Sequence, residues 1–224
     1  MELRPIAYLH GDFPEKFGVP RQSGLARTLS RVVFEPEFRD PNALRGIEEY
    51  SHLWLIWQFS ENAEEWQPTV RPPRLGGNTR VGVFATRSPF RPNPLGLSLV
   101  RLVKAEKEPG LGVVLWVEGA DMVDGTPVFD IKPYLPYADS APDAKGGFGE
   151  ALKGERLEVS VPPELAAKLP PEKLAPLLDA LAQDPRPAYI DDAERVYGFA
   201  YAGFEVKFRV EEGKAIVTDI EVRA

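Results

Sequence analysis

The segment from Arg71 to Arg101 reads RPPRLGGNTRVGVFATRSPFRPNPLGLSLVR and contains six arginines but no aspartate or glutamate. The whole chain of 224 residues has a formal charge of −7, so the residues outside this segment together carry −13. A basic island in an acidic chain indicates a local anionic partner rather than general attraction. Two apolar runs predict strands: Val81–Ala85, within the segment, and Leu97–Val103, which continues just past its end.

The connector between these two runs is predicted to be rigid. Its three prolines each fix one backbone φ angle, and Asn93 and Gly96 add turn chemistry. Such a connector holds Arg87 and Arg91 in a defined arrangement, and the planar donors of arginine suit carboxylates and phosphates. The alternative is a proline-rich loop whose arginines are only solvated.

Short apolar runs separated by Pro and Gly continue through the N-terminal part of the chain. They predict further strands at residues 3–9, 28–35, 50–59, 113–118 and 128–131. Residues 41–48 predict one or two helical turns. Residues 13–24 predict a loop that either presents backbone groups to a ligand or only connects two strands. Many short strands with Pro and Gly turns favour a β-barrel or a β-sandwich.

The character of the sequence changes after residue 139. Residues 139–149 are rich in Gly, Pro and Ala and predict a linker. Four leucines at helical spacing predict a helix at 171–181, and strands are predicted at 196–202, 204–210 and 215–222. We therefore predict a mainly β protein with two domains, residues 1–141 and a small α+β domain of residues 142–224.

Several kinds of site are disfavoured by composition. The chain has no cysteine and only two histidines, which excludes thiolate metal sites and argues against a histidine-based metal cluster. Neither a P-loop nor a strand–GxGxxG–helix pattern is present. No stretch of roughly 20 apolar residues and no secretory leader are visible, so we expect a cytoplasmic protein without a membrane span.

The segment Thr86–Ser98, TRSPFRPNPLGLS, resembles the signature of the TsaA-like / TrmO family of S-adenosylmethionine-dependent tRNA methyltransferases. Four other stretches resemble the same family in the expected order: Gly18–Gly24, Glu49–Trp54, Asp121–Tyr134 and Gln183–Tyr189. The resemblance covers nearly the whole chain. It implies a β-barrel that binds S-adenosylmethionine and a homodimer. It also implies methylation of N6 of threonylcarbamoyladenosine at position 37, in the anticodon loop, with a threonine-accepting tRNA as the expected substrate. Because a loop substrate needs a second surface to fix its orientation, we expect the C-terminal domain to assist tRNA binding.

The resemblance also implies roles for individual residues. Cofactor contacts are implied for Pro20, Arg21, Gln22, His52, Leu53, Arg87, Leu97, Asp121, Met122, Val123 and Asp124. Because a carbamoylated nitrogen must lose its proton, a base is expected nearby, and Asp130, Lys132 and Tyr134 are candidates that the sequence does not rank. Substrate contacts are expected from Phe90, Arg91 and Asn93.

Other interpretations of these residues stay open. His52 is more often a core or edge histidine than a catalytic group, and Asp124-Gly125 is also the pattern of a simple turn. Phe90 and Tyr134 either stack on a splayed RNA base or belong to the core. At the level of function, the alternatives are a non-catalytic barrel that binds a nucleotide or RNA, and a methyltransferase that acts on a small molecule.

Overall fold

The computed structural model describes residues 2–61, 65–72, 75, 78–152, 156–186, 192 and 194–223. Arg74 of the basic island and residues 187–189 of the last family-like stretch lie outside these ranges. None of the helices within the described ranges is long and apolar enough to cross a membrane.

The described chain forms twelve strands, three α-helices and several 3-10 turns. The strands are β1 (Ala7–His10), β2 (Leu29–Phe34), β3 (His52–Gln58), β4 (Thr69–Val70), β5 (Val81–Gly82), β6 (Leu95–Glu108), β7 (Gly112–Glu118), β8 (Thr126–Pro133), β9 (Glu158–Ser160), β10 (Tyr197–Tyr201), β11 (Phe204–Glu211) and β12 (Lys214–Val222). The helices are α1 (Pro136–Asp139), α2 (Pro163–Ala166) and α3 (Pro171–Ala182), with 3-10 turns η1 (Pro36–Phe38), η2 (Pro41–Leu44), η3 (Ile47–Glu49), η5 (Val83–Ala85) and η6 (Gly147–Leu152).

Six strands close into a barrel in the order β1-β2-β7-β6-β3-β8, which confirms the predicted barrel. Strand β3 shows how the sequence builds it, because its side chains alternate strictly between buried and partly exposed. Leu53, Leu55 and Trp57 point into the core, while Trp54 and Ile56 face outward. The same alternation in the first half of β6 fixes the register between the two strands.

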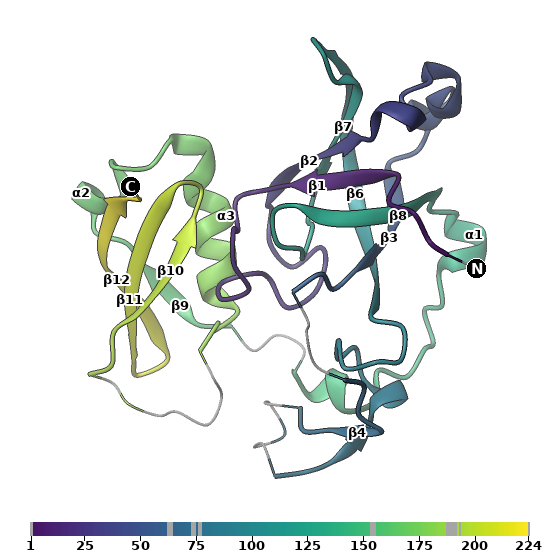
Figure 1. Cartoon of the computed structure of the whole chain (residues 1–224). Coiled ribbons are helices and arrows are strands. Elements are labelled where there is room, and N and C mark those ends of the chain that lie inside the picture. The colour runs from purple at the N-terminus through teal and green to yellow at the C-terminus, as the bar shows by residue number, and fades with distance from the viewer. Residues whose placement is uncertain are drawn as a thin grey trace.

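The C-terminal part forms a second, four-stranded sheet in the order β10-β11-β12-β9, with α3 packed against it. Figure 1 shows α3 between this sheet and the barrel. The buried leucines of α3, Leu177 and Leu181, lie on the helical face that the sequence predicted. The core of this sheet also contains Phe13, which comes from the loop after β1.

The structure corrects three details of the predicted elements. The predicted strand Val81–Ala85 is only two residues long, because the chain turns into η5 and the carbonyl of Val83 accepts from Thr86 and from Arg91 instead of a strand partner. The first strand begins at Ala7 and not at residue 3. Strand β9, which pairs in parallel with β12, was not predicted; its three residues are too few to show a pattern.

Gly96 and Trp57 form a close contact inside the barrel. They are partners in the register of β3 and β6, and both are buried. A Cβ atom at residue 96 would lie 2.1 Å from the Trp57 ring, so glycine is the residue that leaves room for the indole.

We predict that Gly96→Ala lowers the free energy of unfolding by about 1–3 kcal/mol, because the added methyl overpacks the core against Trp57. Gly82→Ala is the matched control, since a Cβ at the exposed Gly82 meets nothing within 4 Å. Its effect should stay within about 0.5 kcal/mol. Denaturant unfolding of both variants measures this, and equal losses would contradict the packing explanation.

Candidate active site

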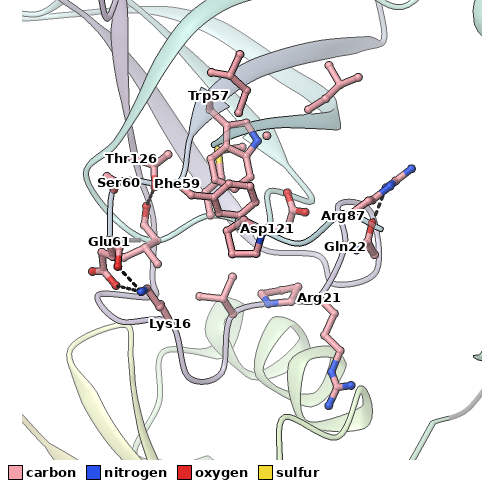
Figure 2. Close-up of a pocket in the computed structure, with 18 of the residues that line it drawn as sticks. Lys16, Arg21, Gln22, Trp57, Phe59, Ser60, Glu61, Arg87, Asp121 and Thr126 are labelled. Carbon is pink, nitrogen blue, oxygen red and sulfur yellow. Dashed lines mark hydrogen bonds and ion pairs between the residues drawn. The ribbon is translucent and has the colours of Figure 1, made fainter. Parts of the chain in front are cut away.

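One end of the barrel opens into a cavity of about 600 Å³. The strands there are antiparallel, so the end of β3, the start of β6, the end of β7 and the start of β8 meet at the same end. Loops carry the chain over this opening, and Figure 2 shows their side chains converging on it. The lining comprises residues 16, 19–22, 54, 57, 59–61, 86, 87, 89–91, 95–97, 121–123 and 126.

A hydrogen-bonded chain of three side chains forms part of the cavity wall. The indole Nε1 of Trp57 donates to Ser98 Oγ at 2.9 Å, and the Ser98 hydroxyl donates to Asp121 Oδ1 at 2.5 Å. Ser98 is fully buried and Trp57 is 5% exposed. Because the serine hydroxyl has a single proton, the indole donor commits that proton to the carboxylate.

Asp121 is the titratable group whose environment is most unusual in this cavity. Burial raises the pKa of Asp121 above its ordinary value, while the hydrogen bond from Ser98 and the positive charge of Arg87 act in the opposite direction. The result is a carboxylate in a largely desolvated wall with a cationic neighbour. Such a group suits a positively charged part of a ligand.

Two contacts close the rim of the cavity. Arg87 Nη1 donates to Gln22 Oε1, which joins the basic island to the loop of residues 11–28. At another part of the rim, Lys16 Nζ donates to the carbonyl of Glu61 and lies 3.9 Å from its carboxylate. Both contacts are drawn in Figure 2.

The predicted substrate residues occupy different positions. Phe90 and Arg91 line the cavity. Arg91 Nη1 donates to the carbonyls of Val83 (3.1 Å) and Thr86 (2.7 Å), and its guanidinium lies 5.6 Å from the ring centre of Phe84. Asn93 is exposed and does not line the cavity. At least one edge of Arg91 therefore holds its own loop together.

Most of the cofactor residues implied by the resemblance come together here. Those lining the cavity are Pro20, Arg21, Gln22, Arg87, Leu97, Asp121, Met122 and Val123. Three do not line it. Leu53 is a fully buried core residue. His52 is the first residue of β3, at the end of the strand away from the cavity, and its Nδ1 lies 2.9 Å from Ser51 Oγ. The Asp124 carboxylate instead accepts from the backbone N–H of Gly11 at 3.1 Å and lies 3.3 Å from His10 Nδ1.

None of the three candidate bases lines the cavity. Lys132 and Asp130 form an ion pair of 2.9 Å on β8. The ring of Tyr134 lies 6.0 Å from Trp54 and 6.3 Å from His52. Trp54, which is the strand partner of Lys132 and a ring neighbour of Tyr134, does line the cavity.

Three lining residues, Lys16, Trp57 and Phe59, were not predicted from the sequence as parts of the site, and neither was Ser98, which supports Asp121 from behind the lining. Ser98 left a recognisable signal, because it is a polar residue at an inward position of the apolar run Leu95–Leu102. The pairing of Lys16 with Glu61 left none. Among the residues that the structure describes, no three His, Cys, Asp or Glu side chains gather as a metal site requires.

Comparison with known proteins identifies the family. The profile of the tRNA-methyltransferase O N-terminal domain matches residues 8–140, and that of the TrmO C-terminal domain matches residues 154–223. A tRNA (adenine(37)-N6)-methyltransferase of Escherichia coli K12 is 42% identical over 234 residues, which cover 99% of this chain and 98% of the relative. A Pseudomonas aeruginosa relative, named as a proposed S-adenosylmethionine-dependent methyltransferase, is 46% identical over 84% of this chain and 82% of its own length.

The fold comparison agrees with the sequence comparison. A crystal structure of TrmO superposes with a TM-score of 0.80 at 33% sequence identity, covering 99% of both chains. Both domain profiles, the full-length relative and the whole-chain superposition lead to the same assignment: the chain belongs to the tRNA-methyltransferase O family.

Proposed function

We propose that this chain transfers a methyl group from S-adenosylmethionine to N6 of adenosine 37 in tRNA, where that adenosine carries a threonylcarbamoyl group. The observation that carries the proposal is the cavity at the barrel mouth, into which Pro20–Gln22, Arg87 and Asp121–Val123 all converge. Its volume of about 600 Å³ suits a cofactor-sized ligand. The name of the full-length Escherichia coli relative supports the tRNA adenosine as substrate.

The residues around the cavity fit S-adenosylmethionine. The Asp121 carboxylate offers negative charge to a cationic ligand, which both the ammonium and the sulfonium of this cofactor provide. The rings of Trp57 and Phe59, 4.3 Å apart, offer an aromatic surface for a nucleobase or a cation. When bound, S-adenosylmethionine supplies an electrophilic methyl group, so the protein needs no nucleophile of its own.

The work left to this chain is orientation and removal of a proton. Holding the reacting groups in line supplies much of the rate of such a transfer. We assign the proton acceptor to the cluster of Asp130, Lys132 and Tyr134. Trp54 lines the cavity and neighbours two of these candidates, Lys132 as its strand partner and Tyr134 through their rings, so an adenine beside Trp54 would lie close to them.

The tRNA side of the proposal rests on the basic island. A splayed anticodon-loop base can stack on Phe90, and Arg91 can pair with the threonine carboxylate or a phosphate through the edge that does not hold Val83 and Thr86. Asn93 is exposed beside them. We propose that the C-terminal domain adds to tRNA affinity, that a threonine-accepting tRNA is the substrate, and that the enzyme acts in the cytoplasm.

The role proposed for Asp121 predicts that binding of S-adenosylmethionine depends on pH. Because its pKa is raised by burial and its ionised form attracts the cationic cofactor, affinity for S-adenosylmethionine should increase as the pH rises through that pKa. Asp121→Asn should weaken binding by about tenfold or more and remove this pH dependence. Arg87→Ala should move the profile to higher pH, since Arg87 lowers the pKa of Asp121.

The stability of the fold should change with pH in the opposite direction to cofactor affinity, and decrease as the pH rises. A carboxyl whose folded-state pKa is raised gives its stability below its unfolded-state pKa, and that stability is lost as the pH rises through the folded-state pKa. Asp121→Asn should therefore unfold at a higher temperature than the wild type at neutral pH. Calorimetric titrations and thermal unfolding at several pH values measure both effects. A flat wild-type binding profile with full affinity at low pH would contradict the role of the carboxylate.

The substrate is tested by incubating the protein with labelled S-adenosylmethionine and threonine tRNA with or without the threonylcarbamoyl group. We expect label in adenosine 37 of the modified tRNA and at least about tenfold less in the unmodified one, which lacks the group that Arg91 is proposed to bind. Label in neither tRNA, together with cofactor binding, would favour a small-molecule substrate.

Assembly is a separate expectation. On the outer face of β3 and β6, Ile56 is paired with Leu97 and Trp54 with Leu99, and Leu97 is 56% exposed. Such an apolar sheet face suits an interface, so we propose a homodimer. Light scattering should give twice the mass of the chain, and Leu97→Glu should give the monomer. Val222→Glu, at an exposed valine of β12, is the matched control; a wild-type monomer at micromolar concentration would contradict the dimer.

A further inference from the structure

The loop that carries Pro20–Gln22 to the cavity is bound mainly to the C-terminal domain. It leaves the barrel after β1, and its Phe13 is buried in the core of the second sheet, 5.2 Å from the ring of Tyr201. Phe17 and Val19 pack against the same core, with Phe17 edge-on to Phe199 at 6.2 Å. Residues that belong to the N-terminal part of the sequence thus complete the C-terminal core.

Gly18 shows how closely the loop lies against this core. Its φ angle is +96°, a conformation that favours glycine, and a Cβ atom there would lie 2.3 Å from the Phe199 ring. Any larger residue would push the loop away from the second sheet. The position of the loop is therefore set by contact with β10, not by the barrel alone.

Polar contacts reinforce this arrangement at the start of the loop. The carboxylate of Asp12 accepts two hydrogen bonds from Lys173 Nζ, at 2.7 and 2.8 Å, and the Asp12 carbonyl accepts from the N–H of Ala202 at 2.8 Å. Glu15 accepts from the N–H of Ala200 at 3.0 Å. These contacts connect the loop to α3 and to β10.

The residues that directly follow α3 hold the part of the loop that reaches the cavity. The side-chain oxygen of the buried Gln183 accepts the backbone N–H of Arg21 at 3.3 Å, and the Arg21 guanidinium donates to the carbonyls of Asp184 and Arg186. Figure 2 shows this side chain leading away from the cavity towards α3. Arg21 therefore lines the cavity mainly through atoms other than its guanidinium.

Asp179, one turn earlier on α3, holds the other end of the loop. Its carboxylate accepts three hydrogen bonds from Arg27, from the backbone N–H (3.1 Å), Nε (2.7 Å) and Nη2 (3.1 Å). The carbonyl of Asp179 also accepts from the side-chain amide of Gln183 at 3.2 Å. The C-terminal end of α3 and the residues after it thus fix both Arg21 and Arg27. Gln22 and Ser23 lie between these two anchors in the sequence, and Pro20 directly precedes the first.

We infer that the C-terminal domain is a structural part of the cofactor site, and that Gln183 and Asp179 are positioning residues for Pro20–Gln22. This inference rests on the proposed binding of S-adenosylmethionine in the cavity. It assigns the domain a role besides assistance with tRNA. Deleting the domain cannot separate the two roles, because the deletion would also expose Phe13, Phe17 and Val19.

Point variants separate the role of the C-terminal domain in the cofactor site from its role in tRNA binding. Gln183→Leu removes the acceptor of the Arg21 N–H, and Asp179→Asn weakens the hold on Arg27. Each should raise the Kd for S-adenosylmethionine by about three- to tenfold, the loss expected for one or two hydrogen bonds. The KM for tRNA at saturating cofactor should stay unchanged. Lys214→Ala, which breaks the surface ion pair with Glu158 (2.7 Å) elsewhere in the same domain, is the matched control and should change neither value.

A measurement without cofactor keeps the inference testable by itself. Hydrogen exchange followed by mass spectrometry on the full-length variants should show faster exchange in residues 18–24 for Gln183→Leu and unchanged exchange for Lys214→Ala. If Gln183→Leu does not fold, Arg27→Ala removes the side-chain hydrogen bonds to Asp179, the second anchor, from the loop side. Normal loop protection in the α3 variants, or a raised tRNA KM with wild-type cofactor affinity, would overturn the inference. Faster loop exchange in a protein that never binds S-adenosylmethionine would instead overturn the proposed function.

Discussion

The contact between the Trp57 indole and Gly96 is the constraint on which the rest of the site depends. The missing side chain at Gly96 admits the indole into the barrel. With the ring in place, its N–H reaches Ser98, and the serine hydroxyl is thereby committed to Asp121. The same indole forms part of the cavity surface. The register of two strands thus determines where the buried carboxylate lies and how it is hydrogen-bonded.

The basic island has a different meaning in the structure from its meaning in the composition. Arg101 pairs with Glu118, Arg80 donates to Thr69, and Arg91 holds two carbonyls of its own loop. Part of this positive charge therefore stabilises the fold around the opening. Arg87 is the described arginine of the island whose charge acts on Asp121. The clustering of arginines in the sequence therefore did not show how many of their guanidinium groups pair within the protein and how many can bind a ligand.

The barrel could be predicted because alternation of buried and exposed residues is a local property, and β3 and the start of β6 display it clearly. The strand predicted at Val81–Ala85 was too long because its local apolarity resembles a strand while Arg91 takes the carbonyl of Val83. The resemblance predicted cofactor contacts for Pro20–Gln22 and Asp121–Val123, and the structure brings these two segments together in the lining of one cavity. The contacts that hold these segments could not be predicted. Gln183, for example, lies 162 residues from Arg21 in the sequence, and no local pattern connects the two.

The burial of Phe13 in the C-terminal core has a consequence for the newly made chain on the ribosome. The barrel strands, up to residue 133, can be synthesised before any of β10 exists, and during that time Phe13 has no core to enter. Synthesis proceeds at about 5–20 residues per second, so the loop stays unanchored for several seconds at least. The cavity would then be completed late and in one step, once Phe199 and Tyr201 have been synthesised and Phe13 can pack against them. A translation fragment that stops before β10 would have the barrel strands but an unanchored loop of residues 11–28, so the barrel would fold before the cavity is complete.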